Sequence, residues 1–308
     1  MATQTKKPAI RTIASFDLRR YWQSCVEDVE AGLDRWLPSV RTKPATIHKA
    51  MRYSLFAGGK RVRPAVCLAA AEACGGKREK ALPAACAVEC IHTYSLIHDD
   101  LPAMDNDDFR RGKPTNHKVF GEGIAVLAGD ALLTQAFELL SRFPDSRRYG
   151  HREAVAELAK ASGSLWLIGG QVADLEAEGK GVSVRELKYI HERKTSALLT
   201  ASLKLGGMSA GCTPRQLEAL DVFGYHVGLA FQVIDDILDV TQTSEALGKT
   251  AGKDEAVGKA TYPCLVGLEK SRKLAKRLTH QAYESLDVFG KRKEPLLAIA
   301  KYLLERSH

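Results

Sequence analysis

The sequence predicts an all-α protein, and three observations support that prediction. Apolar residues recur at spacings of three and four through nearly the whole chain, which is the period of one helix face. Glycine and proline groups interrupt this period sharply, and no segment alternates apolar and polar residues between turn signals as strands do. No linker, repeat or low-complexity block divides the 308 residues. We therefore expect one helical domain spanning residues 1–308, with 1–16 as a flexible tail.

The N-terminal half begins with a helix that follows the apolar series Leu18, Trp22, Cys25 and Val29 and ends before Pro38. The apolar period then predicts helices over the ranges 46–56, 64–74, 79–100 and 124–142. The breaks around them fall at the glycine pairs 58–59 and 75–76 and at Pro144. These residues are the usual signals of turns and helix ends.

The C-terminal half is predicted to be equally helical, over the ranges 152–177, 184–205, 214–241, 262–288 and 295–306. Two of these helices begin with capping signals. Ser183 with Glu186, and Thr213 with Gln216, have the spacing of a capping box, and Pro214 suits the first helical position. The glycines at 179–181 and 206–207 are expected to end the helices before them.

The composition is ordinary for a globular protein, with 45% hydrophobic and 27% charged residues. Lysine and arginine number 45 against 37 acids, and this net charge of +8 fits anionic ligands. No basic patch interleaved with aromatic residues is present, so we expect no nucleic-acid partner. We also expect no membrane span, because no apolar run reaches the necessary length, and there is no signal-peptide core.

The seven cysteines form an odd set without a CxxC pair, which is typical of a reducing compartment. The first sixteen residues contain no acid and include Lys6, Lys7 and Arg11, which faintly resembles a transit peptide. A disordered tail is the preferred interpretation. We therefore expect a cytoplasmic protein.

Two acidic clusters lie beside apolar, helix-forming sequence, in LIHDDLPAMDND and in FQVIDDILDV. Their members are Asp99, Asp100 and Asp105, and Asp235, Asp236 and Asp239. Like charges at this density are unfavourable unless a cation is shared, and clusters of oxygen ligands suit Mg²⁺ better than Zn²⁺. Either cluster alone could be a solvated acidic turn. Together they predict metal ions bound to a phosphorylated substrate.

The spacing of these acids supports that prediction. Asp235 and Asp239 are four positions apart and share one helix face. Asp99 and Asp105 are six apart, and Pro102 between them is expected to end the helix. Asp99 would then lie in a last helical turn, where the helix dipole disfavours an anion and a bound cation would relieve the cost.

Basic motifs accompany both clusters. In GGKRVRP, Lys60 and Arg63 are three positions apart and could converge on one diphosphate, although a basic helix start is the alternative. The cations would oppose the dipole at a helix start, which favours the ligand. Arg110 and Arg111 lie in a predicted loop and could reach two different phosphates.

Three further motifs complete the set of candidate residues. His92 lies two helical turns before Asp99 and should share its face, although it could be a core histidine. Lys194-Thr195 and Gln232 fall on predicted helices. The segment 248–263 is rich in glycine and lysine, as a lid over phosphates would be.

These motifs, in their order along the chain, resemble the trans-polyprenyl diphosphate synthase family. The resemblance is carried by GGKRVRP, IHTYSLIHDDLPAMDNDDFRRGKPTNH, LAGDALL, Lys194-Thr195, FQVIDDILD and GKTAGKDEAVGKATYP. It covers roughly Pro44 to Leu268 and is greatest to bacterial farnesyl diphosphate synthases and the related geranylgeranyl diphosphate synthases. It implies the isoprenoid synthase fold, with ten or more helices around a central cavity, and a homodimer.

The resemblance also implies roles for individual residues. Asp99, Asp105 and Asp235 would coordinate three Mg²⁺ ions that bridge an allylic diphosphate. The same diphosphate would be gripped by Arg110, Lys194 and Lys249. Isopentenyl diphosphate would be held by Lys60, Arg63, His92 and Arg111. Lys259 would help to close the site, and Thr195 and Gln232 would stabilise the allylic carbocation with their oxygen dipoles.

The expected reaction is ionisation of the allylic diphosphate, attack by the isopentenyl double bond and loss of a proton. Tyr94, beside the small Ser95, lies five positions before Asp99, which is about 7.5 Å along a helix. In the family an aromatic residue at this level typically blocks the cavity near C15, so we predict farnesyl diphosphate as the product. A geranylgeranyl diphosphate synthase is the alternative, since Tyr94 could be a core residue that points elsewhere.

Three other classes of protein fit less well. A metal phosphohydrolase built on the His98-Asp99 doublet would need further histidines and would leave the second cluster unexplained. A non-catalytic partner subunit would be expected to have lost aspartates, and none is missing. A terpene cyclase has no need of the second diphosphate site that Lys60, Arg63 and Arg111 would supply.

Overall fold

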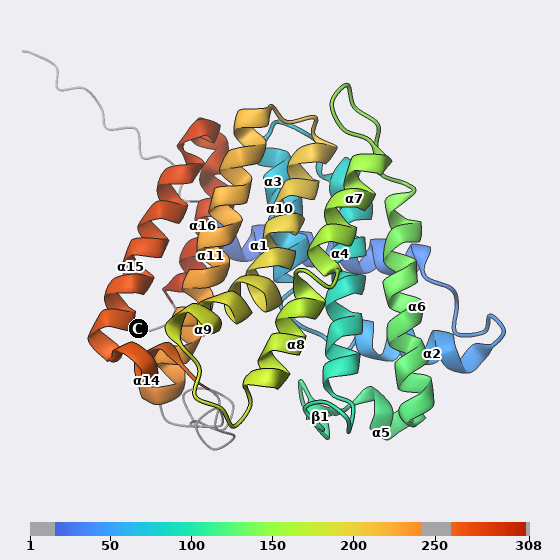
Figure 1. The fold of residues 1–308 in the computed structure, drawn as a ribbon. Coiled ribbons are helices and arrows are strands. Elements are labelled where there is room, and N and C mark those ends of the chain that lie inside the picture. The colour runs from blue at the N-terminus through green and yellow to red at the C-terminus, as the bar shows by residue number, and fades with distance from the viewer. Residues whose placement is uncertain (1–15, 242–259, 306–308) are drawn as a thin grey trace, which may run out of the picture.

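The computed structural model describes residues 16–241 and 260–305, which are almost entirely helical (Figure 1). The N-terminal elements are α1 (Leu18–Trp36), α2 (Ala45–Leu55), α3 (Val62–Ala73), α4 (Arg78–Asp99), β1 (Phe109–Arg110), β2 (Lys113–Pro114), α5 (Asn116–Phe120), α6 (Glu122–Leu140), α7 (His151–Ser162) and α8 (Leu167–Ala177). The C-terminal elements are α9 (Val184–His191), the π-helical η1 (Glu192–Ser196), α10 (Ala197–Ser209), α11 (Pro214–Thr241), α14 (Tyr262–Val266), α15 (Leu268–Ser285), the 3₁₀ segment η2 (Leu286–Lys293) and α16 (Glu294–Leu304). The predicted all-α class is confirmed.

The core lies between long helices that run side by side. α4 packs on α3 and α6, α10 on α3 and α11, and α11 on α15. In Figure 1 the C-terminal ends of α4, α8 and α11 all lie at the lower edge of the molecule. The two acidic clusters lie at or near the ends of α4 and α11, so the topology brings both to the same edge.

The local start and stop signals mostly act as predicted. The side chain of Ser183 accepts a hydrogen bond from the backbone of Glu186, and Thr213 and Gln216 form the reciprocal pair of a capping box. α4 ends at Asp99, three residues before Pro102, as a helix ahead of proline should.

Two glycines that were expected to end a helix instead lie inside α10. A Cβ at Gly206 would lie 2.0 Å from the carbonyl oxygen of Cys67, and one at Gly207 would lie 2.5 Å from Leu220 Cδ1. These glycines let α10 approach α3 and α11 closely, so the predicted boundary at 205 is wrong and the helix runs to Ser209.

Other boundaries also differ from the prediction. The range 152–177 divides into α7 and α8, and the range 262–288 divides at Gly267, whose φ of 84° breaks the helix. A short antiparallel hairpin, in which Phe109 faces Pro114, was not expected. It holds the Arg110-Arg111 motif at its turn.

Two helices, α6 and α11, are long and apolar enough to cross a membrane by length and composition alone. Core helices pass the same test, and 44% and 50% of the two apolar windows are buried inside the fold. Packing in the core can therefore explain the apolar composition of α6 and α11. The absence of a membrane span stays a prediction.

Candidate active site

Three cavities adjoin one another through shared lining residues of α3, α4 and η1. The central apolar cavity, of about 580 Å³, is lined by Tyr94, Leu96, Val126, Leu167 and Leu198, among others. An acidic pocket of about 160 Å³ shares Lys194 and Thr195 with it, and a basic pocket of about 520 Å³ shares Arg63 and His92. The three adjoining cavities therefore offer an acidic region, a basic region and an apolar space that borders both.

The basic pocket unites four predicted residues, Lys60, Arg63, His92 and Arg111. Burial, followed by the charges of Arg63 and Arg111, holds the pKa of His92 well below its usual value. His92 is therefore neutral, and it can donate a hydrogen bond to an anion without adding charge.

The glycines of GGKRVRP make room for an arginine in this pocket. Arg111 donates a hydrogen bond to the carbonyl oxygen of Gly58. A Cβ at Gly59 would lie 2.4 Å from Arg111 Nη1, and the φ of 126° at Gly59 also requires glycine. The two loops are therefore fitted to one another, and the contact places Arg111 beside Lys60.

Arg61 is a residue whose importance the sequence did not reveal. Its backbone is left-handed, with a φ of 50°, and its side chain is buried. The guanidinium donates hydrogen bonds to Glu89 at 2.7 Å and to the carbonyl oxygen of Leu55 at 2.5 Å. This turn directs Arg61 inward and leaves Lys60 exposed, with its ammonium 5.6 Å from the ring centre of Tyr302.

The acidic pocket is lined by Asp235 and Asp236 from α11 and by Asp174 from α8. Asp236 accepts a hydrogen bond from the backbone N–H of Tyr262 at 2.9 Å and lies 3.4 Å from His191 Nε2. Asp239, which shares a face with Asp235 in the sequence, is buried. Asp235 and Asp236 thus both line the pocket, and Asp236 in addition holds the start of α14.

The first acidic cluster contributes Asp99, which lines the central cavity at the end of α4. Burial raises the pKa of Asp99 to about 6, and the negative charge of Asp105 adds to this rise. The backbone N–H of Asp105 donates a hydrogen bond to the Asp99 carbonyl at 2.9 Å. The loop after α4 thus brings the two predicted metal ligands together.

Arg110 is not brought to the acidic pocket. Its guanidinium makes a bidentate pair with the buried Asp100, with Nε at 2.8 and 2.9 Å and Nη2 at 2.5 Å from the carboxylate oxygens. The pair lines a small pocket of about 30 Å³ that shares Arg111 with the basic pocket. In this structure Arg110 orders the loop that follows α4.

Lys194 and Thr195 lie on η1, a π-helical turn of the kind often found at functional sites. Burial alone would lower the pKa of Lys194, but the carboxylate of Asp174 at 2.6 Å raises it overall. The Thr195 hydroxyl donates a short hydrogen bond to Gln232 Oε1. The Thr195 and Gln232 oxygens each retain a free lone pair that can stabilise a developing positive charge.

Two residues of α8, Gln171 and Asp174, were missed because the range 152–177 reads as one continuous helix. A Cβ at Gly170 would lie 2.4 Å from the backbone nitrogen of Lys194, so this glycine allows α8 to approach η1. Gln171 lines the central cavity, and its buried amide nitrogen has no hydrogen-bond partner among the described residues. The glycine pair 169–170 ahead of an amide and an acid was the available signal.

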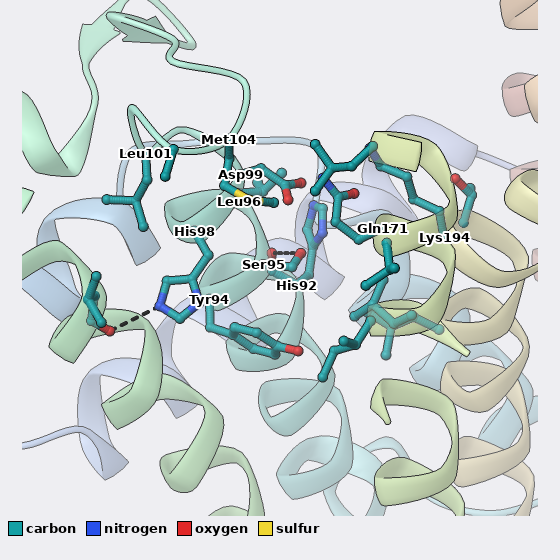
Figure 2. A pocket seen from close by; sticks show the side chains of 18 of the residues that line it. His92, Tyr94, Ser95, Leu96, His98, Asp99, Leu101, Met104, Gln171 and Lys194 are labelled. Carbon is teal, nitrogen blue, oxygen red and sulfur yellow. Dashed lines mark hydrogen bonds between the residues drawn. The ribbon is translucent and has the colours of Figure 1, made fainter. Parts of the chain in front are cut away.

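Tyr94 and Ser95 both line the central cavity. Figure 2 shows Asp99 and the Tyr94 ring on opposite sides of Ser95. The Tyr94 hydroxyl is buried without a hydrogen-bond partner among the described residues. The two lysines expected in the lid, Lys249 and Lys259, lie outside the described residues, and Ala260 just after them lines the acidic pocket.

The donor set fits Mg²⁺, although in residues 16–241 and 260–305 no three His, Cys, Asp or Glu side chains form a ready metal site. Mg²⁺ is ordinarily held by one or two carboxylates together with substrate phosphates and water, rather than by a cage of protein ligands. Asp99, Asp105 and Asp235 supply only oxygen; Asp99 lines the central cavity, Asp235 lines the acidic pocket, and Asp105 lies in the loop that follows Asp99. Asp99, Asp105 and Asp235 are thus suited to a cation that arrives with a diphosphate.

A comparison with protein families decides the relationship, because the polyprenyl synthetase model matches residues 44–295. The chain belongs to the polyprenyl synthetase family. Members of this family use Mg²⁺ with diphosphate substrates. The chain is a short-chain trans-prenyltransferase, and its substrates are isopentenyl diphosphate and an allylic diphosphate.

Curated relatives match this polyprenyl synthetase over its length. The large subunit 1 of a heterodimeric geranylgeranyl pyrophosphate synthase of Arabidopsis thaliana, a chloroplastic protein, is 53% identical over 96% of this chain and 81% of its own. The chloroplastic geranylgeranyl pyrophosphate synthase of Capsicum annuum is 51% identical over 100% of this chain and 82% of its own.

Solved structures agree on the fold. An FPP/GFPP synthase of Zymomonas mobilis is 37% identical, with a TM-score of 0.82 over 93% of this chain and 98% of its own. A geranyltransferase of Helicobacter pylori, complexed with magnesium and isoprenyl diphosphate, is 34% identical, with a TM-score of 0.78 over 96% of this chain and 98% of its own. The chain has the all-helical isoprenoid synthase fold.

The expectation of a cytoplasmic location is wrong, because four curated relatives that cover 95–100% of the chain are named as chloroplastic. The expectation rested on cysteines without a disulfide pattern, which indicate only that a compartment keeps thiols reduced. It also set aside the acid-free, basic residues 1–16.

Proposed function

We propose that this polyprenyl synthetase is a geranylgeranyl diphosphate synthase, which adds isopentenyl units to an allylic diphosphate until the product has twenty carbons. One observation carries the proposal of a condensing enzyme, namely that a basic pocket and an acidic pocket each share lining residues with the same apolar cavity. A reaction that joins two diphosphates needs two anion sites of different character on either side of a hydrocarbon space.

The basic pocket would bind isopentenyl diphosphate through side chains alone. Lys60, Arg63 and Arg111 supply the positive charge, and neutral His92 supplies a hydrogen-bond donor. The allylic diphosphate would lie on the opposite side, gripped by Lys194 and held through Asp99, Asp105 and Asp235. Mg²⁺, three ions by our expectation, would neutralise the diphosphate there and favour its departure.

The reaction then follows from the charges around the central cavity. The allylic C–O bond breaks and its electron pair leaves with pyrophosphate. The isopentenyl double bond attacks the allylic carbon, a C–C bond forms, and a proton passes to a pyrophosphate oxygen. The oxygens of Thr195 and Gln232 would stabilise the carbocation by their dipoles, and the apolar walls would keep water away from it.

The twenty-carbon product is supported by the curated relatives at about half identity, all of which are named as geranylgeranyl synthases. The second candidate is farnesyl diphosphate, and the position of Tyr94 in the cavity wall, on the side of Ser95 away from Asp99, favours it. The two candidates share every residue of the diphosphate sites. They differ in how far the hydrocarbon chain extends past Tyr94.

Product analysis separates the two candidates. Purified chain incubated with Mg²⁺, labelled isopentenyl diphosphate and dimethylallyl diphosphate is expected to release mainly geranylgeranyl diphosphate, measured by chromatography of the dephosphorylated alcohols. A farnesyl product would favour the second candidate and leave the family intact. A chain that releases phosphate without forming a C–C bond would point to a phosphohydrolase, and an inert chain to a non-catalytic subunit.

Arg111 provides a test of the basic pocket. Replacing it by Met is expected to raise KM for isopentenyl diphosphate by about 10- to 100-fold, since a charge-assisted contact to phosphate is lost. KM for the allylic substrate should change little, because Arg111 does not line the acidic pocket. Steady-state kinetics with each substrate varied in turn would measure both, with the exposed Arg272→Met on α15 as the matched control. An equal rise in both KM values would contradict separate sites.

The pKa of Asp99 predicts how activity depends on pH. Burial raises this pKa to about 6, so without metal the carboxylate is protonated below that pH. Since Mg²⁺ binds the deprotonated form, the Mg²⁺ concentration for half-maximal activity should rise about tenfold per pH unit below 6 and level off above it. Titrations of Mg²⁺ between pH 5 and 8 would measure this. A requirement that does not change with pH would argue against Asp99 as a ligand.

We further propose that the chain forms one domain and a homodimer. One curated relative is named as the large subunit of a heterodimer, so a second, different subunit is the competing arrangement. Sedimentation of the purified chain alone would distinguish them, because a homodimer needs no other protein.

A further inference from the structure

The structure assigns a specificity-determining position to His98, which we infer holds the Tyr94 ring in place and is itself held by α6 through Gly129. His98 would not contact the diphosphates. It would act on product length through Tyr94. This inference rests on the proposed function, because it concerns the cavity that receives the growing chain.

The Tyr94 ring lacks a polar anchor. Its hydroxyl is buried, and no hydrogen-bond partner is found for it in the part of the chain that the structure describes. Its ring packs edge-on against the imidazole of His98, with the centroids 5.7 Å apart and the planes at 77°. Tyr94 and His98 both line the central cavity, as Figure 2 shows. The ring position therefore depends on packing, and His98 supplies one side of it.

His98 in turn is fixed to α6. Its Nε2 lies 3.0 Å from the carbonyl oxygen of Val126, the contact drawn as a dashed line in Figure 2. Because a carbonyl only accepts, Nε2 must carry a hydrogen. Its ring also fills the space above a buried glycine. A Cβ at Gly129 would lie 2.0 Å from Nε2 and 2.4 Å from Cδ2.

Gly129 is thus needed for the observed position of His98. It lies within α6 with ordinary helical backbone, so the helix itself does not require glycine there. Its effect on the cavity is steric. An alanine would push the imidazole off Val126 and into the central cavity, whereas removal of the imidazole would give Tyr94 room to turn toward α6.

These two changes have opposite expected effects on product length. Gly129→Ala should shorten the products, raising the ratio of C15 to C20 by about tenfold, the size expected for displacing a hydrogen-bonded aromatic partner. His98→Ala should raise the ratio of products longer than C20 to C20 by a similar factor. The double variant should behave as His98→Ala, since the methyl group added on α6 would have no imidazole to displace.

The experiment is a product distribution measured for the full chain and its variants under one set of conditions. Gly123→Ala is the matched control, because it lies in the same helix and its Cβ would meet nothing within 4 Å among the described residues. Tyr94→Ala gives the reference for an open cavity. His98→Gln can still donate a hydrogen bond to the Val126 carbonyl. Its product distribution should therefore be closer to that of the unmodified chain than the distribution of His98→Ala is.

Each outcome bears on a different claim. Failure of the unmodified chain and of Gly123→Ala to consume isopentenyl diphosphate would overturn the proposed function. Consumption with an unchanged distribution in both His98 variants would overturn this inference alone. A shortening by Gly129→Ala that persists in the double variant would show that Gly129 acts without His98. If Gly129→Ala does not fold, as judged by its thermal melt, the two His98 variants decide the matter.

Discussion

Replacing Asp99 by Asn is expected to lower kcat/KM for condensation by on the order of a thousandfold, because a preorganised charge at the departing diphosphate is removed. Asp99 lies at the end of α4 and lines the central cavity, which shares Lys194 with the acidic pocket. Asparagine keeps the shape of the side chain and loses its charge. Asp235→Asn should have a similar effect from the opposite helix.

The measurement is the initial rate of isopentenyl diphosphate consumption at saturating Mg²⁺. Glu218→Gln is the matched control, because Glu218 is an exposed acid on the same helix as Asp235 and lines none of the three cavities. Both aspartate variants are expected to lose most of this rate and to keep an unchanged melting temperature. A decrease in kcat/KM of less than tenfold in both variants would show that the two acidic clusters do not take part in the reaction.

Replacing Glu89 by Ala is expected to destabilise the fold by about 3–5 kcal/mol, because the charge of Arg61 would stay buried without its partner. The side chains of Arg61 and Glu89 are 1% and 2% exposed, and the ion pair between them is 2.7 Å long. For a chain of this size such a loss lowers the melting temperature by roughly 5–8 °C. Urea denaturation followed by circular dichroism would measure it directly.

Two further variants make this test specific. Glu269→Gln removes a surface partner of Arg272, whose side chain is half exposed, and should change stability by less than about 0.5 kcal/mol. Arg61→Met combined with Glu89→Leu removes both buried charges and should recover much of the lost stability. A Glu89→Ala variant as stable as Glu269→Gln would mean that the Leu55 carbonyl and Glu30 alone compensate the arginine.

Many elements of the fold were predictable because their signals are local. The capping boxes at Ser183 and Thr213 and the end of α4 ahead of Pro102 depend on residues a few positions apart. The candidate ligands could also be identified from the sequence alone. Acids, lysines and arginines beside apolar helical sequence require an explanation wherever the chain places them.

Glycines were the main source of error in the prediction, because a glycine can either end a helix or allow a distant segment to approach closely. Gly206 and Gly207 read as a helix end, yet they permit α10 to pack on α3 and α11. Gly170 and Gly129 lie within helices, and one allows the close approach of η1 while the other leaves space for His98. A close approach between distant segments leaves no trace in the neighbouring sequence.

The helical class, the two acidic clusters and the family motifs of a prenyltransferase could all be read from the amino-acid order. Which charges meet could be learned only from the packed molecule. Its packing pairs Arg110 with Asp100, Lys194 with Asp174 and Arg61 with Glu89, and it leaves Lys60, Arg63 and Arg111 around one pocket. The difference arises because helix formation depends on residues within a turn or two, whereas an ion pair or a cavity depends on which distant helices pack together.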